Sequence, residues 1–375
     1  MDKQLNIEKL KSAMDEKGLN QSALAKNLDV SRAIISEWLK GTKFPRPNKL
    51  LKIGMTLDVP FRELVIRSSK HEPIVAFRKK GGRKTKNCHV ERAKDMGRLL
   101  DALAPCLPFS SLTNPPSLKN ARLEYRYLQE VAQQVRAQIG ASDEAPIKLE
   151  DFIKKFNEFD VVLIPVLWGR KLNHENALHI HLPASGTTWI YLNLDSNFHD
   201  FNFWLAHELG HVLSQKFEGD EAEDFADAFA QALLFPEKCA ASVYKEVSEL
   251  STDGNKIKRV IEAANKYDIS PITVYESVNS YAAANGLTEL ALTPGLYAAT
   301  TNFNKGYHNV SDALGKGRQL SAQSYIALAK DIFESPFFET LKRFLSENEK
   351  SPGFIQNILQ VDFVDAKGIF RELIA

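Results

Sequence analysis

Two histidines spaced four residues apart offer the clearest chemistry in this sequence. His207 and His211 begin and end the string His-Glu-Leu-Gly-His. On a helix this spacing places both side chains on one face, where two neutral imidazoles can chelate one Zn2+. Glu208, beside the first histidine, is placed to act as a general base on a water molecule at an open coordination position. These residues therefore predict a zinc site with hydrolytic chemistry.

A catalytic zinc site also needs a third protein ligand and groups that orient the histidines. Glu223 and Asp227 stand four residues apart, so one could bind zinc while the other accepts a histidine N–H. The carboxylates that compete with them are Glu218, Glu221 and Asp224. The upstream histidines that could stabilise an oxyanion are His179, His181 and His199.

The residues around the histidine pair indicate a buried helix. They are Phe203, Trp204, Leu205, Leu209, Val212 and Leu213. Burying two histidines and a glutamate without a metal or a partner would be costly. The alternative is a histidine pair that is hydrogen-bonded within a helical core.

The segment that follows carries a more specific pattern. Residues 223–230 read Glu-Asp-Phe-Ala-Asp-Ala-Phe-Ala, and residues 233–236 read Leu-Leu-Phe-Pro. Together with the histidine string, this resembles the ImmA/IrrE family of zinc metallo-endopeptidases. The resemblance implies a zincin-like metallopeptidase domain over 119–288 with one Zn2+ per chain, Glu223 as the third ligand and Asp227 as the group that orients a histidine. It also implies peptidases that cleave a repressor.

Residues 20–41 have the pattern of a helix-turn-helix, two short helices joined by a tight turn. Asn20 is a plausible N-cap for the first of these helices, and the second starts at Ser31. The apolar positions that can face inward are Leu24, Ala25, Leu28, Val30, Ile35 and Trp38. The polar positions that can face outward are Arg32, Ser36 and Lys40.

This string, with Gly41 and Pro45 after it, resembles the XRE or lambda-repressor-like family over about the first 66 residues. The resemblance implies a five-helix domain in which Gln21 clamps a DNA phosphate at a helix N-terminus and the start of the third helix reads bases. Carried over by position, the candidate DNA contacts are Gln21, Arg32, Ser36 and Lys40.

A helical protein-binding module is the alternative for this domain, and the acidic Glu37 on the reading helix favours it. A basic segment favours DNA instead. Residues 75–90 hold no acidic residue and carry Arg78, Lys79, Lys80, Arg83, Lys84 and Lys86. Lysine and arginine side chains near DNA phosphates increase DNA affinity, because their binding releases counterions.

The composition sets the wider frame. With 375 residues the chain is long enough for two or three domains, and a net charge of +1 says nothing about partners by itself. Three scattered cysteines and the lack of a long apolar run lead us to expect a cytoplasmic protein without a membrane partner.

The predicted fold is mainly α with a small β-sheet, an α+β class. Strands are expected at 161–164, 178–181 and 189–192, and helices over most of the remainder. The predicted divisions are a helix-turn-helix domain at 1–68, a basic linker and helix at 69–118, the metallopeptidase domain at 119–288 and a helical region at 289–375. Amphipathic spacing in that last region indicates packed helices, which could form a homodimer.

Together these features predict a transcriptional regulator that binds a double-stranded DNA operator. Its zinc domain would cut the protein itself or a repressor-type partner, and so switch genes of a stress response or a mobile element. Two alternatives stay open. One is a non-proteolytic repressor whose zinc domain senses a ligand or a partner, and the other is an antitoxin or phage-defence component.

Overall fold

The computed structural model describes residues 2–40, 43–68, 72–76, 87–109, 118, 120–168, 177–214, 217, 219–315 and 320–375. The chain forms two compact units, Met1–Glu72 and Pro73–Ala375. The segments predicted as a linker with a helix, 69–118, and as a separate helical region, 289–375, both contribute elements to the second unit. Most of the basic segment and Glu218 lie outside the described residues.

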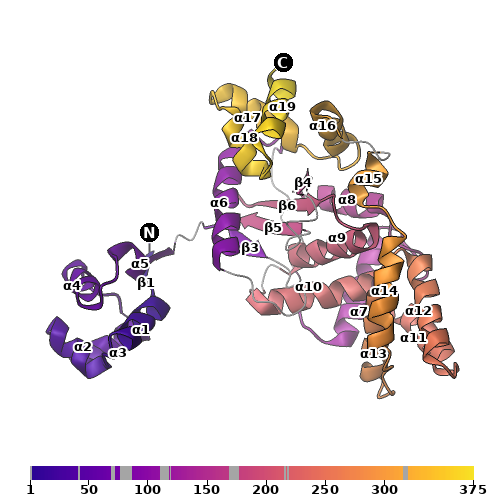
Figure 1. Ribbon diagram of the computed structural model, residues 1–375, viewed down its shortest axis with the longest axis horizontal. Helices are drawn as coiled ribbons and strands as arrows, with labels where there is room; N and C mark the ends of the chain where they lie inside the picture. Colours follow the sequence, from indigo (N-terminus) through magenta and orange to yellow (C-terminus); the bar gives the residue numbers. More distant parts are fainter. Residues whose placement is uncertain are drawn as a thin grey trace. The chain divides into compact units, whose positions relative to one another are not determined.

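The first unit is a small helical domain closed by two paired strands (Figure 1). Its elements are β1 (Asp2–Leu5), α1 (Ile7–Glu16), α2 (Gln21–Leu28), α3 (Arg32–Leu39), α4 (Pro47–Leu57), α5 (Phe61–Leu64) and β2 (Val65–Ser68). The side chains of Asn20 and Ser31 cap α2 and α3 by accepting from the backbone N–H groups of Ala23 and Ile34. The core between the helices includes the fully buried Leu24 and Ile35.

The second unit is built on a mixed sheet of order β3-β5-β6-β4. The strands are β3 (Ile74–Ala76), β4 (Val161–Val166), β5 (Ala177–Leu182) and β6 (Thr187–Asn193). β5 pairs antiparallel with both β3 and β6, and β4 pairs parallel with β6. The hairpin register places Ile180 opposite Trp189.

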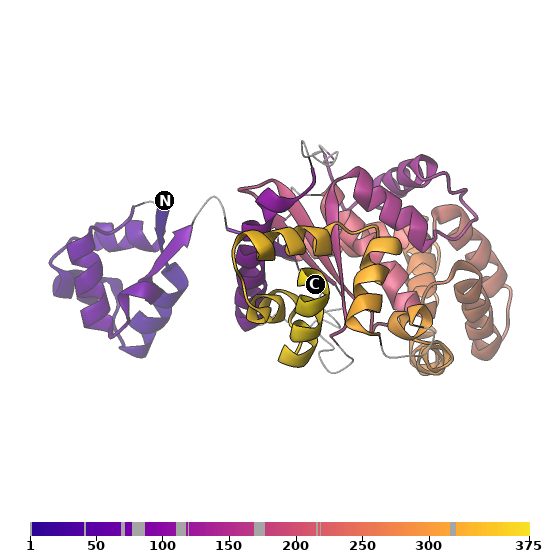
Figure 2. The ribbon, with the colours of Figure 1, turned by 90° about the horizontal axis from the view of Figure 1, so that it is seen from above.

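Helices cover both faces of this sheet, because successive strand residues point to opposite sides. On β4, Val161 and Leu163 enter the core shared with α7 to α10, whereas Val162 and Ile164 enter the core shared with α6 and the C-terminal helices. Figures 1 and 2 show these C-terminal helices, in yellow, gathered over the strands. The helices are α6 (Asn87–Leu103), α7 (Tyr125–Gln138), α8 (Leu149–Glu158), α9 (Phe198–Leu213), α10 (Gly219–Leu234), α11 (Glu237–Ser248), α12 (Asp253–Tyr267), α13 (Pro271–Ala284), α14 (Thr293–Lys305), α15 (Val310–Leu314), α16 (Ala322–Asp331), α17 (Phe337–Glu347), α18 (Pro352–Leu359) and α19 (Phe363–Ile374).

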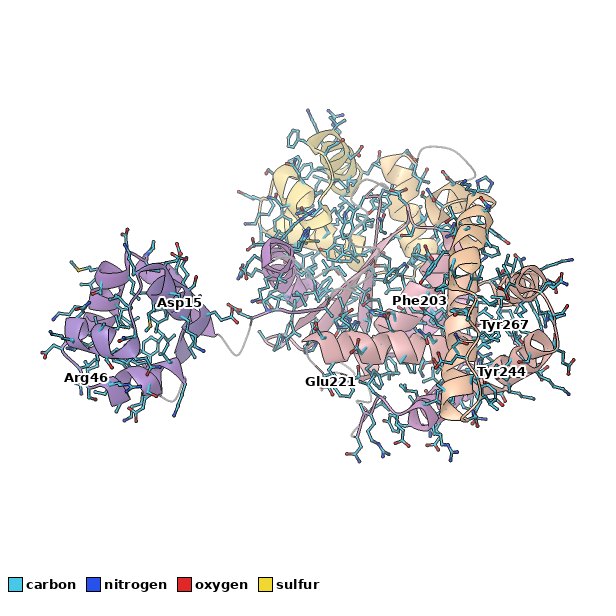
Figure 3. The ribbon with its side chains drawn as sticks, turned by 60° about the horizontal axis from the view of Figure 1, so that its bottom comes forward. Asp15, Arg46, Phe203, Glu221, Tyr244 and Tyr267 are labelled. Carbon is cyan, nitrogen blue, oxygen red and sulfur yellow. The ribbon has the colours of Figure 1, made fainter. Side chains whose placement is uncertain are left out.

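Helices α11 to α14 extend the layer that holds α9 and α10. Tyr267, labelled in Figure 3, packs edge-on against Phe235 just after α10. Tyr244 packs on Tyr281 of α13. Phe203, also labelled, is buried within α9. The helix that carries the histidine pair therefore lies deep in a large apolar core.

The predicted α+β class with a small sheet is confirmed, and β4, β5 and β6 fall on the three predicted strand segments. The short strands β1, β2 and β3 were not predicted. Among the described residues, no helix combines the length and the apolar character that a membrane span requires.

Candidate metal centre

The close packing of α9 against α10 positions the site. Gly210 makes this approach possible, because a Cβ atom there would lie 3.0 Å from the Ala226 Cα and 3.2 Å from the Phe229 ring. The two small residues let the backbones of α9 and α10 meet. The first half of α10 is thereby held beside the histidine face of α9.

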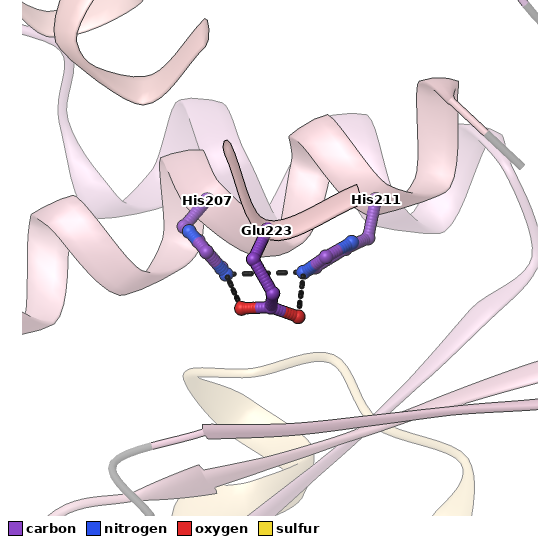
Figure 4. A group of neighbouring side chains, drawn as sticks. All are labelled: His207, His211 and Glu223. Carbon is purple, nitrogen blue, oxygen red and sulfur yellow. Dashed lines mark hydrogen bonds and ion pairs between the residues drawn. The ribbon is translucent and has the colours of Figure 1, made fainter. Parts of the chain in front are cut away.

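Three side chains converge at this contact (Figure 4). The Nε2 atoms of His207 and His211 lie 3.0 Å apart. The Glu223 carboxylate reaches both, with Oε2 3.5 Å from His207 Nε2 and Oε1 3.3 Å from His211 Nε2. All three residues are buried, and their ligand atoms lie within 4.8 Å of one another. Tetrahedral zinc with bonds of about 2.0–2.2 Å separates its ligand atoms by roughly 3.3–3.6 Å. Both histidine–carboxylate distances lie in this range, and the distance between the two Nε2 atoms is shorter.

Asp227 fixes the orientation of the first histidine. Its Oδ1 lies 2.8 Å from His207 Nδ1, so that nitrogen donates to the carboxylate. In the neutral ring the lone pair then sits on Nε2 and points toward His211 and Glu223. Electron-pair donors converge there, and the buried Glu223 Oε2 has no hydrogen-bond partner among the described residues. This donor set fits a divalent cation with a preference for nitrogen and oxygen, such as Zn2+.

Glu208 lies beside this group and faces the sheet. Its Oε2 is 3.4 Å from the Nδ1 of His179 on β5, and within the described part of the chain neither atom has a hydrogen-bond partner. The His179 ring also lies against His211, with ring centroids 5.5 Å apart. A reacting group between β5 and α9 would therefore meet both a carboxylate and an imidazole.

Burial and mutual contact shift the acidity of these groups. Burial raises the pKa of Glu208 to about 7. Burial also opposes charge on His207, but its hydrogen bond to Asp227 and the neighbouring Glu223 carboxylate outweigh this and raise its pKa to about 9. Burial would raise the pKa of Glu223, yet the two histidines lower it to about 2. At neutral pH these pKa values leave His207 protonated, Glu223 ionised and Glu208 able to accept or release a proton, and a metal ion would displace the Nε2 proton of His207.

The competing candidates fall outside this group. Glu221 and Asp224 are exposed on α10. His181 lies on β5, where its Nδ1 is 3.0 Å from Thr188 Oγ1. His199 lies in the first turn of α9 and packs against Phe303 and Tyr307.

The predicted DNA contacts lie on α2 and α3 of the first unit. Gln21 and Arg32 are the first residues of these helices, Ser36 is half-buried in the middle of α3, and the exposed Lys40 follows α3 as its C-cap. Glu37, which favoured the protein-binding alternative, is 3.0 Å from Lys43 in an ion pair. That pairing offsets its negative charge on the reading helix.

Comparison with known proteins identifies the first unit. Residues 10–64 match the helix-turn-helix family, so the chain carries a helix-turn-helix domain of the XRE type, a class of DNA-binding regulators. A solved structure of Bacillus thuringiensis PlcR in complex with the peptide PapR7 and DNA is 11% identical and covers 98% of each chain. Its TM-score of 0.16 is too low to support any argument. No curated protein matches the sequence.

Proposed function

We propose that this DNA-binding regulator carries a zinc-dependent endopeptidase of the ImmA/IrrE type in its second unit, and that it cuts itself or a repressor-type partner to switch gene expression. The supporting observation is the convergence of His207, His211 and Glu223 around one point, with a buried carboxylate, Glu208, beside them. A purely structural site would not require a general base at that position.

In this proposal His207, His211 and Glu223 hold the ion, and Asp227 holds His207 in the tautomer that binds it. When bound, zinc supplies Lewis-acid polarisation of a carbonyl oxygen. Glu208 removes a proton from the attacking water and returns it to the leaving amine, and a pKa of about 7 suits both transfers. His179 is placed to orient the Glu208 carboxylate.

The helix-turn-helix domain supplies the DNA side of the proposal. Free N–H groups at the start of α2 and the side chain of Gln21 would hold a phosphate, while Arg32 and Ser36 of α3 would face the major groove. Operator binding and cleavage would then be joined on one chain.

A cavity favours a second candidate, a repressor whose second unit senses a small ligand without cutting. The cavity has a volume of about 630 Å³, and its lining includes Asp195, Ser311, Leu320, Tyr325, Val364 and Ile369. This size suits a small organic molecule. Ser311 N–H donates to the Leu194 carbonyl in the loop before α9. This hydrogen bond links the wall of the cavity to the segment that leads into the helix carrying the histidines.

The decisive experiment compares the purified wild type with Glu208→Gln. Mass spectrometry should find about one zinc in both proteins, and DNA binding should be equal. When each is mixed with lysate of the source cell, cleavage products should form only with the wild type. Identical products from both would refute the peptidase, and an unchanged regulatory output with Glu208→Gln would favour the sensor.

A His211→Ala variant tests the ligand assignment separately. It should lose the zinc while it keeps the fold of the first unit and its DNA binding. Equal zinc content in this variant would show that His211 is not a ligand.

A further inference from the structure

The strand β3 occupies the edge of the sheet nearest the metal centre. It is three residues long and pairs antiparallel with β5, with Ile74 opposite His181, Val75 opposite Ile180 and Ala76 opposite His179. Because the strand order is β3-β5-β6-β4, removing β3 would leave one edge of β5 free. In Figure 1 β3 lies on the side of the sheet that faces α10, and it packs against that helix.

The register fixes which face each residue of β3 occupies. Residues directly opposite one another in a sheet point to the same face. Ala76 therefore shares the face of His179, whose ring contacts Glu208 and His211. Val75 shares the other face with Ile180 and packs in the core beneath α6. The backbone of β3 thus runs directly alongside the strand that borders the site.

Beyond its pairing with β5, β3 is held mainly by Pro73 and Val75. Pro73 is buried against α6, where Gly97 has no Cβ, and a Cβ there would lie 2.6 Å from the Pro73 side chain. Val75 is partly buried, and Ile74 is 50% exposed. A three-residue outer strand, with two side chains that are only partly buried and one that is exposed, costs less to release than a central strand.

We propose that β3 is an internal competitor for polypeptide substrates: the chain's own residues 74–76 occupy the edge of β5 on which an extended substrate segment would pair. This rests on the proposed peptidase function and states how that site is regulated. The ligand class is an unfolded or extended polypeptide segment, which adds to a sheet edge through its backbone.

Competition follows from hydrogen bonding. The outward N–H and C=O groups of β5 can pair with one strand at a time, so a substrate binds only when β3 leaves. The apparent affinity for substrate is lowered by the fraction of molecules in which the edge is free. Releasing β3 should therefore increase peptide binding, and fastening it should abolish binding.

The test uses the full chain loaded with zinc, and variants that act in opposite directions. Val75→Asp places a charge in the core beneath α6 and should release β3, and Gly97→Ala should do the same by displacing Pro73. The double variant Val75→Cys/Ile180→Cys should lock β3 to β5 through a disulfide across a directly opposed pair. Leu287→Asp, which introduces the same charge at a side chain that is 42% exposed beyond the end of α13, is the matched control.

Two readouts separate this inference from the proposed function. In a Glu208→Gln background, a labelled peptide that copies residues 72–79 should bind the released variants about tenfold more tightly or better than the parent, and the control should bind like the parent. The locked variant should not bind until a phosphine reductant opens the disulfide. With Glu208 intact, cleavage of a quenched peptide should follow the same order.

Equal peptide affinity in the parent and in both released variants would overturn the proposal, as would unimpaired binding by the oxidised locked variant. If release increases binding but no variant with Glu208 cleaves any peptide, the edge competition stands and the peptidase assignment fails. If cleavage occurs at a rate that neither release nor locking changes, the peptidase stands and the competition fails.

Discussion

Replacing Gly210 should weaken metal binding without altering any ligand. An alanine Cβ would lie 3.0 Å from the Ala226 Cα and 3.3 Å from its Cβ. The helix would gain about 1 kcal/mol in propensity from Gly to Ala, and overpacking against α10 would cost about 1–3 kcal/mol. Gly210→Ala should therefore destabilise the second unit by about 0–2 kcal/mol. Gly210→Val, with two more methyl groups at the same contact, should cost about 2 kcal/mol or more.

Metal affinity should fall further than stability alone predicts, because α10 carries both Glu223 and Asp227. A shift of α10 by a few tenths of an ångström misplaces a ligand and the group that orients His207. Changes to such orienting groups typically cost about 10–100-fold in metal affinity. We expect Gly210→Val to weaken zinc binding at least about tenfold, measured by competition with a chromophoric chelator. Urea unfolding of the chelator-treated protein measures separately how much the substitution lowers the free energy of unfolding.

Gly254→Ala is the matched control, since no atom lies within 4 Å of a Cβ placed there in the first turn of α12. It should leave zinc affinity unchanged and increase stability by about 0.5–1 kcal/mol. Wild-type zinc affinity in Gly210→Val would show that the helix contact does not position the site. An equal loss of affinity in Gly254→Ala would show that the effect is not specific to the contact.

Further predictions concern charge. The pKa of His207 is raised from 6.5 to about 9, so the stability that its protonated form gains from Asp227 is fully present below pH 6.5 and is lost as the pH rises through 9. In chelator-treated protein, urea midpoints of the wild type and Asp227→Asn should accordingly differ near pH 6 and converge above pH 9, and a constant difference would refute the assignment. In the proposed function Glu208 is the base, and burial raises its pKa to about 7; peptide cleavage should therefore decline as the pH falls below 7, and a flat profile from pH 5 to 8 would exclude it as the base. Arg32→Ala should weaken operator binding by roughly tenfold, as seen by fluorescence anisotropy, whereas neutralising the exposed Lys258 on α12 should not; equal losses would point to non-specific charge effects.

The elements with strong local signals could be predicted from the sequence. The caps Asn20 and Ser31 mark the starts of α2 and α3 because their side chains satisfy free N–H groups within three residues. β3 gave no such signal. Its three residues precede a basic segment, and Val75 becomes a strand residue only through pairing with Ile180, more than a hundred positions away. The same holds for the parallel pairing of β4 with β6, which depends on contacts that no local pattern encodes.

Within the site, local spacing was sufficient for the histidine pair but not for its partners. The i, i+4 rule applies to any two residues on one helix, so it cannot tell which acidic residue of α10 meets α9. That choice is made by Gly210 and Ala226, which set the rotation of α10 so that Glu223 and Asp227 turn inward while Glu221 and Asp224 stay exposed. His179 was only one of three histidines that could stabilise an oxyanion, because its approach to Glu208 depends on how β5 lies over α9, which no local pattern gives.

Because α10 carries Glu223 and also packs against β3, a change at the edge strand could act on the site in two ways. Releasing β3 could free the edge of β5, or it could move α10 and displace the ligand. The two mechanisms differ in zinc affinity. Competition at the edge leaves zinc affinity as in the wild type while peptide binding rises, whereas displacement of α10 lowers zinc affinity as in Gly210→Val and does not increase peptide binding. Measuring both quantities in Val75→Asp decides between them, and the exposure of Ile74 together with the partial burial of Val75 leads us to expect the first.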